Sequence, residues 1–548
     1  MKRKDVVVNI AETLKEVAKE KIDQVGLIEA KTGRIVTFSK LDLLSDGYAA
    51  YLKNEGIYAG DTVILMVAPS AEFICLTFAL FKLGTPVILI DPGMGYKNLL
   101  TCIERVRPKI LIGMPKALLF KKVFPQPFQT VSKTFCCGKS FGLFGRDIRK
   151  CISPTIQPFP LFKPTGEDLA AIIFTTGSTG PPKGVRYEHS VFAAQLRLIR
   201  DYFGIGADDI DQPAFPLFAL FSTALGACSI IPDMDPTRPS RVDPEKFVAS
   251  IQKHKVTYSF GSPAIWNVVS KYCIEKNLVL QSMRKVLMAG APVPYDLLKR
   301  VKAILPNDAS IFTPYGATES LPIASISGNE VLSETWTESK TGKGTCVGKA
   351  LPGLEIKILE ISDDPVPDYK KETELAPYHI GEIVVKGDVV TRSYENNRSE
   401  TLLAKIKDGE EFWHRMGDVG YLDDQCRLWF CGRKSHRVQM INRTLYTIPC
   451  ESIINEHPDV YRTALVGCSW NNDEYQTPVI IVEPHKKKKL DRGKLIREVK
   501  KIAASSELTS EVSFFLIHES FPVDIRHNAK IFREKLALWA QKKLFSQV

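Results

Sequence analysis

Strand-like apolar runs alternate with helical patterns along much of the chain, and no other feature limits its possible folds as strongly. TVILMVA at 62–68 precedes an apolar helical segment at 71–83, and PVILIDP at 86–92 follows. Strand, helix and strand in this order are typical of parallel sheets with crossover helices. Similar apolar runs return five times, at 110–115, 170–176, 229–234, 258–263 and 286–292. We therefore predict an α/β fold with duplicated, doubly wound and mostly parallel sheets.

The pattern changes after Pro352, where shorter apolar runs replace the strand–helix alternation. These runs lie at 356–361, 381–387 and 419–434, and the last alternates apolar with polar residues. Alternation with a period of two is typical of antiparallel strands that bury one face. We expect a small β-barrel here.

The end of the chain has a compact α+β pattern of its own. Two strand-like runs at 463–469 and 478–484 precede a helical segment at 494–504. A chain of 548 residues is too long for one core, because single cores stop growing at about 250–300 residues. We predict an N-terminal domain of residues 1–433 and a smaller C-terminal domain of residues 434–548.

The charge balance is basic, with 73 Lys and Arg against 62 Asp and Glu, a formal net charge of +11. This excess suits an anionic substrate, an acidic membrane surface or nucleic acid, and charge alone does not choose among them. Because no basic helix or aromatic-interleaved patch stands out, we expect no nucleic-acid partner. We interpret the run Lys486–Lys489 as a solvated loop.

Other features favour a cytoplasmic protein. The 12 cysteines lack paired metal-ligand spacing, so free thiols are expected. The N-terminal segment is a charged, amphipathic helical pattern without the apolar core of a signal peptide. The stretch 73–90 is broken by Lys82, Gly84 and Pro86 and falls short of a membrane span, so no transmembrane segment is expected.

A loop rich in glycine and hydroxyl residues follows directly after the apolar strand at 170–174. Glycines allow the backbone to present N–H groups, and Lys183 adds positive charge, so the loop suits a polyphosphate. It is not a P-loop of the Walker type, because Gly184 follows the lysine in place of Ser or Thr. The loop is Thr175-Thr176-Gly177-Ser178-Thr179-Gly180-Pro181-Pro182-Lys183-Gly184.

This loop resembles the signature of the adenylate-forming superfamily, which includes acyl-CoA synthetases, luciferases and peptide-synthetase adenylation domains. The resemblance extends over nearly the whole chain, and several spaced motifs in the family's order are far more specific than any one of them. The further motifs are Gly290-Ala291-Pro292, Tyr315-Gly316-Ala317-Thr318-Glu319, Trp413-His414-Arg415-Met416-Gly417-Asp418, Gly432-Arg433 and Arg526-His527-Asn528-Ala529-Lys530.

The resemblance implies ATP-dependent adenylation of a carboxylic acid with Mg²⁺. Thr318 would contact the α-phosphate, Glu319 would help to hold magnesium, and Lys530 would reach the carboxylate and the α-phosphate. Asp418 would bind both ribose hydroxyls, and Arg433 would also reach the ribose. The remaining nucleotide-binding residues implied are Thr175, Thr176, Gly177, Ser178, Thr179, Gly180, Lys183, Gly290, Ala291, Pro292, Tyr315 and Gly316. The C-terminal domain would be mobile, with its hinge at Ser435.

Several positions depart from a typical acyl-CoA synthetase. Ala219 stands where many relatives have the His of an aromatic gate, and the segment from Gln439 to Leu445 lacks the Gly that lines the pantetheine path. The chain is more similar to the β-lactone synthetases of bacterial olefin biosynthesis, in the runs 91–93, 432–438 and 445–451.

That closer resemblance implies a long-chain β-hydroxy fatty acid as substrate, whose own hydroxyl displaces AMP to form a β-lactone. CoA would not be used, and other enzymes of an olefin pathway are possible partners. Three alternatives stay open: a fatty-acyl-CoA ligase or acyl-AMP synthetase, an inactive nucleotide-binding module, and a nucleic-acid-binding protein. The retained Lys530, Glu319 and Asp418 argue against the inactive module. Four apolar residues are expected either in an acyl tunnel or in the core, namely Phe215, Phe218, Phe221 and Trp266.

Overall fold

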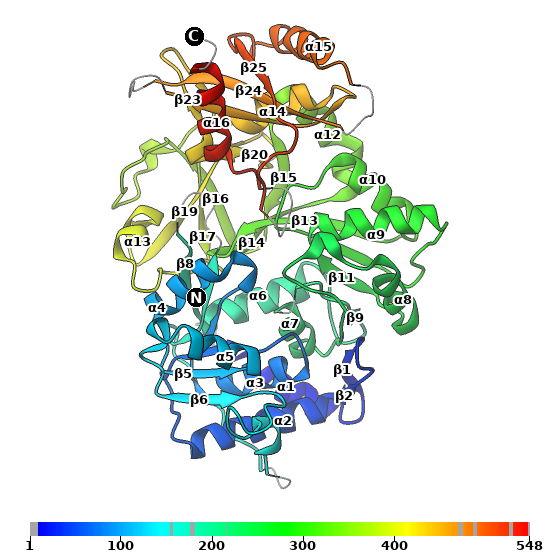
Figure 1. Cartoon of the computed structure of the whole chain (residues 1–548), viewed down its shortest axis with the longest axis vertical. Helices are drawn as coiled ribbons and strands as arrows, with labels where there is room; N and C mark the ends of the chain where they lie inside the picture. The colour runs from blue at the N-terminus through cyan, green and yellow to red at the C-terminus, as the bar shows by residue number, and fades with distance from the viewer. Residues whose placement is uncertain are drawn as a thin grey trace.

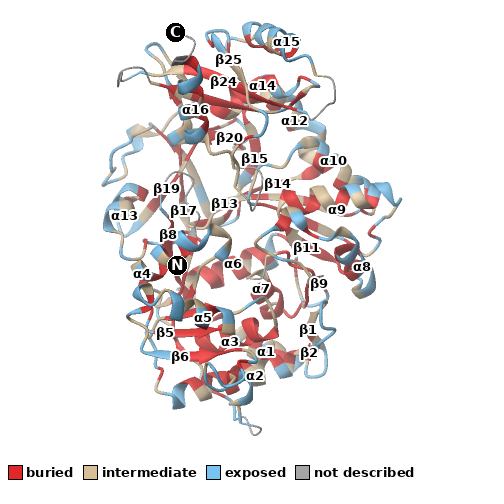
Figure 2. Ribbon diagram, viewed as in Figure 1, coloured by how far each residue is buried: buried red, intermediate tan, exposed pale blue. Residues whose placement is uncertain are grey.

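The computed structural model of the chain describes residues 9–153, 157–175, 181–215, 217–469, 475–485, 490–524 and 530–545. Its architecture is α/β, with two large sheets covered by helices and a smaller C-terminal unit that lies at the upper end of Figure 1. Buried residues concentrate in the strands and in the helix faces packed on them, as Figure 2 shows. The predicted fold class is confirmed.

The first sheet has six strands in the order β6-β5-β3-β4-β7-β8. All neighbours are parallel except β7 and β8, which form an antiparallel hairpin. Its strands are β3 (Val63–Met66), β4 (Val87–Leu89), β5 (Ile110–Gly113), β6 (Lys133–Cys136), β7 (Leu169–Thr175) and β8 (Lys183–Glu188). The helices of this part are α1 (Ile10–Glu20), α2 (Phe38–Asn54), α3 (Ala71–Leu83), α4 (Tyr96–Val106), α5 (Pro115–Val123) and α6 (His189–Asp201).

Helix α3 occupies the stretch that the sequence predicts as an apolar helix, and all 13 of its residues are buried. Lys82 is among them, with its Nζ 2.5 Å from Asp42 and 2.6 Å from Asp46 on α2. A buried ammonium is tolerated when carboxylates pair with it. The lysine that interrupts the apolar pattern is therefore a buried, paired residue between α3 and α2. No helix in the described ranges has the length and apolar character needed to cross a membrane.

The second sheet has 14 strands in the order β16-β17-β19-β20-β15-β14-β13-β12-β11-β9-β10-β1-β2, with β18 paired to β19. Its parallel part comprises β1 (Val25–Glu29), β9 (Ile210–Asp211), β10 (Cys228–Ile231), β11 (Tyr258–Gly261), β12 (Lys285–Met288) and β13 (Ser310–Ala317), with β2 (Ile35–Thr37) antiparallel at the edge. Helices α7 (Phe218–Ala224), α8 (Pro244–His254), α9 (Pro263–Glu275) and α10 (Tyr295–Ala303) connect these strands.

The antiparallel strands expected after Pro352 continue this second sheet. β15 joins the two parts, because it pairs with β14 through Ala350 and Ala324 and with β20 through Thr345 and Phe430. The strands are β14 (Ser320–Ser327), β15 (Thr345–Ala350), β16 (Leu354–Leu359), β17 (Gly381–Gly387), β18 (Lys405–Asp408), β19 (Glu411–Leu422) and β20 (Leu428–Arg433), and α13 (Arg398–Ala404) precedes β18. The short helical turns α11 (Gly328–Glu330) and α12 (Trp336–Glu338) lie between β14 and β15.

The C-terminal unit is built on a three-stranded sheet in the order β23-β24-β25. The sheet packs its apolar side chains against three helices in two clusters. Its elements are β23 (Val460–Cys468), β24 (Thr477–Pro484), β25 (Phe514–Ile517), α14 (Thr447–Asn455), α15 (Arg492–Ala504) and α16 (Arg533–Phe545), preceded by the hairpin β21 (Val438–Gln439) and β22 (Thr444–Leu445). The Lys486–Lys489 run lies outside the described residues.

Candidate active site

The Tyr-Gly-Ala-Thr-Glu motif covers the end of β13 and the turn that leads to β14. Tyr315 pairs with Ala324 across the two strands. Gly316 is required at this turn, since a Cβ there would lie 2.5 Å from the Ser320 carbonyl oxygen. The tight hairpin brings Thr318 and Glu319 to the end of the strands.

Asp418 is held between Tyr315 and Arg433. It lies on β19 directly opposite Arg433 on β20. The Tyr315 hydroxyl donates to Asp418 Oδ2 at 2.5 Å, and Arg433 Nη1 lies 3.0 Å from Oδ1. Burial raises the pKa of Asp418, while Arg433 and the Tyr315 hydrogen bond oppose that rise. Three predicted site residues from distant motifs therefore form one fixed group.

Lys530 lies within electrostatic reach of the same group. Its backbone N–H donates to Asp524 Oδ1 at 3.0 Å, and its carbonyl accepts from the Asp524 N–H at 3.0 Å. The charge of Lys530 lowers the pKa of Asp418. The rest of its motif, 526–529, lies outside the described residues.

Glu319 is positioned by a segment that sequence reasoning missed. The Tyr394 hydroxyl donates to Glu319 Oε1 at 2.7 Å, and the Thr391 N–H and hydroxyl donate to the Glu319 carbonyl at 2.9 and 3.0 Å. On the other side, the Tyr187 hydroxyl donates to the Thr318 carbonyl. No pattern in one sequence identifies these contacts, because Tyr394 is 75 residues from Glu319.

Lys183 begins β8, opposite Thr175 at the end of β7. Its Nζ lies 2.5 Å from Glu400 on α13 and 5.2 Å from the centre of the Tyr394 ring. Lys183 thus belongs to the cluster around Glu319. Thr176, Gly177, Ser178, Thr179 and Gly180 lie outside the described residues, and Thr175 is described by its backbone alone.

Lys405 is a second lysine beside Glu319 that the sequence analysis did not select. It begins β18 and donates to the Thr391 carbonyl. Burial lowers the pKa of Lys405 to about 7, although the charges of Glu319 and Glu188 oppose this shift. An ammonium that loses its charge near neutral pH is uncommon outside functional sites.

Gly290, Ala291 and Pro292 follow the end of β12. Because β11, β12 and β13 are parallel neighbours, these residues lie at the same sheet edge as the Tyr315 turn. Clefts at the carboxyl ends of parallel strands are the usual ligand sites of such sheets. Gly290 has a φ of 95°, which only glycine adopts easily.

The side chains at this site suit a magnesium ion that is bound jointly by a carboxylate and by the phosphates of ATP. They do not suit a metal ion that is held by protein side chains only. Among the described residues, no group of three or more His, Cys, Asp or Glu side chains could hold a metal ion. Mg²⁺ is typically bound by one or two carboxylates together with substrate phosphates. Glu319, a single carboxylate at the end of the β13–β14 hairpin, fits that role.

The four apolar candidates differ in burial, and Phe215 is half-buried with its ring centre 6.0 Å from that of Phe218. Trp266 is fully buried and packs edge-on against Phe247, and Phe221 belongs to a core cluster with residues from both large sheets. Phe218 is half-buried and stacks on Phe260 with ring centres 3.8 Å apart. Trp266 and Phe221 are therefore core residues.

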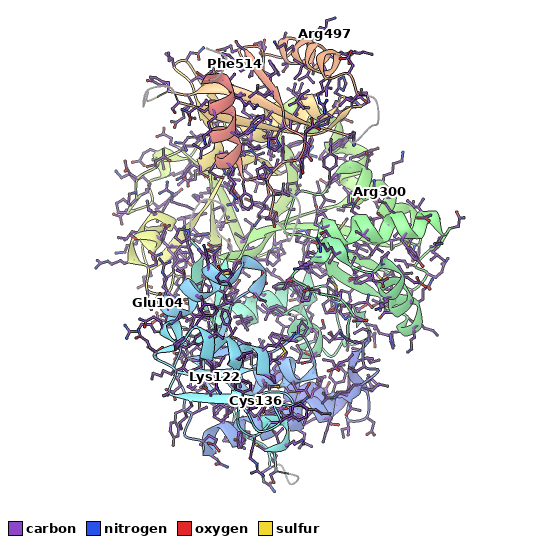
Figure 3. All side chains as sticks on the ribbon, viewed as in Figure 1. Glu104, Lys122, Cys136, Arg300, Arg497 and Phe514 are labelled. Atoms are coloured by element: carbon purple, nitrogen blue, oxygen red, sulfur yellow. The ribbon has the colours of Figure 1, made fainter. Side chains whose placement is uncertain are left out.

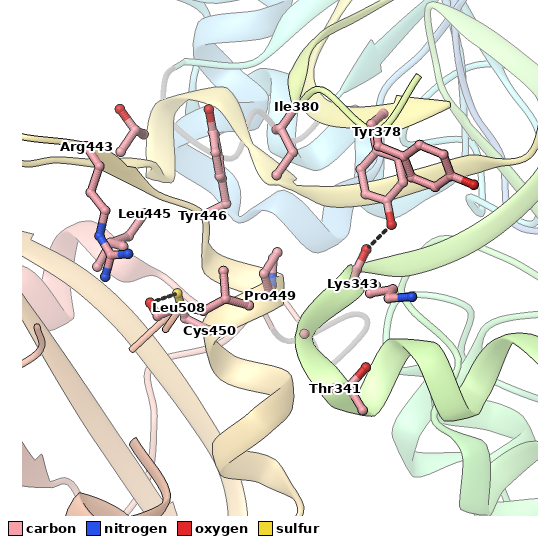
Figure 4. Close-up of a pocket in the computed structure, with 13 residues that line it drawn as sticks. Thr341, Lys343, Tyr378, Ile380, Arg443, Leu445, Tyr446, Pro449, Cys450 and Leu508 are labelled. Atoms are coloured by element: carbon pink, nitrogen blue, oxygen red, sulfur yellow. Dashed lines mark hydrogen bonds between the residues drawn. The ribbon is translucent and has the colours of Figure 1, made fainter. Parts of the chain in front are cut away.

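The altered segment 439–445 forms the hairpin of β21 and β22. Figure 4 shows Arg443, Leu445 and Tyr446 on one wall of a pocket of about 350 Å³, with Lys343 and Tyr378 across from them. None of the predicted nucleotide-binding residues lines this pocket. Ser435 lies in a short turn, 434–436, that joins β20 to this hairpin.

Comparison with known proteins decides the family. The model of the family described as AMP-binding enzyme matches residues 14–395. The chain belongs to the AMP-binding enzyme family. As a member of it, the protein is an AMP-forming ligase or synthetase, and ATP and a carboxylic acid are the substrates expected of such enzymes.

Individual members of the AMP-binding enzyme family are similar over nearly the whole length. The chain is 42% identical to an olefin β-lactone synthetase of Stenotrophomonas maltophilia over 552 residues, covering 98% of each chain. It is 41% identical to the olefin β-lactone synthetase of Xanthomonas campestris pv. campestris, covering 99% of each. The O-succinylbenzoate CoA synthetase of Bacillus subtilis, solved with ATP and magnesium, has the same fold, with a TM-score of 0.74, 24% identity and coverage of 96% of this chain and 98% of that one.

Proposed function

We propose that this enzyme adenylates a β-hydroxy fatty acid with ATP and Mg²⁺ and then closes it to a β-lactone without CoA. The observation that carries the proposal is the 42% and 41% identity, over nearly the full length, to two olefin β-lactone synthetases. An olefin pathway would then supply the acid and consume the lactone, so enzymes of that pathway are the expected partners.

In the first step a substrate carboxylate oxygen attacks the α-phosphorus, and the bond to pyrophosphate breaks. Asp418, fixed by Tyr315 and Arg433, would hold the ribose hydroxyls. Thr318 and Lys530 would stabilise the charge that develops at the α-phosphate, and preorganised groups of this kind supply much of the catalysis of such transfers.

The other phosphates would be held by the loop 175–180 together with Lys183. The 290–292 segment would lie beside the adenine. Magnesium, bound by Glu319 and the phosphates, would offset phosphate charge.

In the second step the β-hydroxyl oxygen attacks the acyl carbon, the bond to AMP breaks and the hydroxyl proton is released. The nucleophile is already part of the substrate, so proximity replaces a thiol cofactor. The altered hairpin 439–445 supports a reaction without CoA, because it contains no glycine that would let the thiol cofactor approach the backbone closely.

We place the boundary of a mobile C-terminal domain, residues 434–548, at the turn around Ser435. Lys530 lies in this domain, whereas Asp418 and Glu319 lie in the N-terminal domain of residues 1–433. Rotation about Ser435 would move Lys530 away after adenylation.

The test is a product assay. The full chain is incubated with ATP, Mg²⁺ and a long-chain β-hydroxy acid, with and without CoA, and products are identified by mass spectrometry. We expect AMP, pyrophosphate and a four-membered lactone in equal yield under both conditions. An acid without the β-hydroxyl should stop at the adenylate. Formation of acyl-CoA from that plain acid at a rate equal to lactone formation would favour the acyl-CoA ligase.

A further inference from the structure

Most of the net positive charge of the chain comes from one segment. Residues 107–153 contain ten Lys and Arg and a single acidic residue, Asp147, a formal charge of +9 out of the +11 of the whole chain. The segment includes β5, α5 and β6, and β6 is the edge strand of the first sheet. Figure 3 places Lys122 and Cys136 at the end of the molecule opposite to Arg497 and Phe514 of the C-terminal unit.

The loop 138–146, which follows β6, presents two large apolar side chains to solvent. Phe141 is 95% exposed and Leu143 is 73% exposed. Hydrogen bonds hold the loop in this form: the Leu143 N–H donates to the Ser140 carbonyl at 3.0 Å, and the Ser140 hydroxyl donates to the Gly145 carbonyl at 3.2 Å. Large apolar side chains that a hydrogen-bonded turn holds in solvent mark a site of interaction with another surface.

Helix α5 extends the same surface. Lys122 Nζ lies 4.8 Å from the centre of the Phe144 ring, so the loop packs beside the end of the helix. Leu119 and Val123, one turn apart on α5, are 53% and 60% exposed. We call α5 together with the loop 138–146 the basic face.

The cations of the basic face are largely available to a partner. Asp147, the acidic residue of the segment, forms a salt bridge with Arg149, whose Nη2 lies 2.6 Å from Asp147 Oδ2. Within the described ranges, no salt bridge involves Lys116, Lys139 or Arg146, all of which are exposed. Exposed apolar side chains on the same segment as exposed cations without salt bridges are complementary to a surface with negative headgroups above an apolar layer.

We propose that the basic face binds the surface of an anionic lipid bilayer, with Phe141 and Leu143 inserted among the headgroups. The aliphatic Leu119, Leu143 and Val123 favour a lipid over a nucleic acid, because a phosphate backbone offers them no apolar contact. Such binding places the protein on the membrane without any spanning helix. The inference does not depend on the proposed reaction.

The experiment is co-sedimentation of the full chain with vesicles of phosphatidylcholine alone or mixed with phosphatidylglycerol. We expect binding to the mixed vesicles only, and a decrease as salt is raised. The double variant Phe141→Ser/Leu143→Ser should bind at least tenfold more weakly. The affinity of the double variant Lys139→Ala/Arg146→Ala for the mixed vesicles should fall about fivefold for each cation removed.

Matched controls change similar residues elsewhere. Leu538 on α16 is 62% exposed, so Leu538→Ser tests the loss of an exposed apolar side chain. Lys370→Ala/Lys371→Ala removes two exposed cations. Both controls should bind mixed vesicles as the wild type does.

Three results would overturn the proposal: no binding of the wild type to the mixed vesicles, equal binding to phosphatidylcholine alone, or equal losses in the controls. Self-association of the protein that disappears with Phe141→Ser/Leu143→Ser, without vesicle binding, would assign the face to a second copy of the chain.

Discussion

The Tyr394 hydroxyl donates a hydrogen bond of 2.7 Å to Glu319 Oε1, although 75 residues separate the two side chains. The Tyr394 ring also faces Lys183, whose Nζ is paired with Glu400. One tyrosine thus connects the residue proposed to hold magnesium with the lysine of the proposed phosphate loop. Ligand-binding side chains are held by such supporting contacts, and losing them weakens binding without removing a ligand.

Tyr394→Phe, which removes only the hydroxyl, is expected to raise the Mg²⁺ concentration needed for half-maximal activity by roughly ten- to a hundredfold, because a hydrogen bond to a charged group contributes about 1.5–3 kcal/mol. Titration of Mn²⁺ binding in the presence of ATP gives a readout apart from turnover. Tyr378→Phe, which removes a hydroxyl bonded to the exposed Asp424, is the control. Equal metal dependence in wild type and Tyr394→Phe would contradict the positioning role.

Lys530→Ala is expected to slow pyrophosphate release by roughly 10²–10³, the usual cost of removing one group that stabilises developing charge. ATP binding, measured by calorimetry, should persist. The matched control is Lys535→Ala, which removes an exposed lysine five residues further on. Near-normal pyrophosphate release in Lys530→Ala would assign the lysine to the surface.

Asp418→Ala is expected to weaken ATP binding by one or more orders of magnitude, since two ribose hydroxyls would lose charge-assisted bonds of ~1.5–3 kcal/mol each. Equilibrium binding of ATP measures the effect. Asp424→Ala, six residues away and exposed, should bind ATP normally. If both variants bind alike, Asp418 is a structural residue of the β19–β20 pair.

The depressed pKa of Lys405 predicts a pH dependence of stability. Between about pH 7 and 10.5 the unfolded state keeps this proton while the folded state has lost it, so stability rises with pH across that window by up to about 1.4 kcal/mol per unit. Urea unfolding at several pH values should show that Lys405→Met removes part of this rise. An unchanged slope would mean that Lys405 stays charged in the fold.

Ser435→Pro is expected to depress turnover while leaving the fold intact, because proline fixes φ at the proposed hinge. The rate of adenylation in a single turnover, compared with the steady-state rate of lactone formation, shows which of the two steps is slowed. Ser435→Ala leaves φ free and is the control. Wild-type turnover in Ser435→Pro would place the hinge elsewhere.

Local pattern alone determined much of the fold. The helix predicted at 71–83 is α3 with the same bounds, and the strand-like runs at 110–115 and 381–387 contain β5 and β17. These elements are readable because hydrophobic periodicity is a property of neighbouring residues. The family could also be predicted from the sequence, because the motifs that contain Glu319 and Asp418 are short runs of contiguous residues.

Tertiary structure decided the rest. The pairing of β15 with both β14 and β20, the burial of Lys82 against Asp42 and Asp46, and the contacts of Tyr394 and Lys405 around Glu319 all join residues far apart in the chain. The sequence also contained the ten cations of 107–153, but not the packing of Lys122 on α5 beside Phe144 in the loop that exposes Phe141. Proximity between distant residues arises from sheet order and packing, and a single sequence has no period or spacing that encodes it.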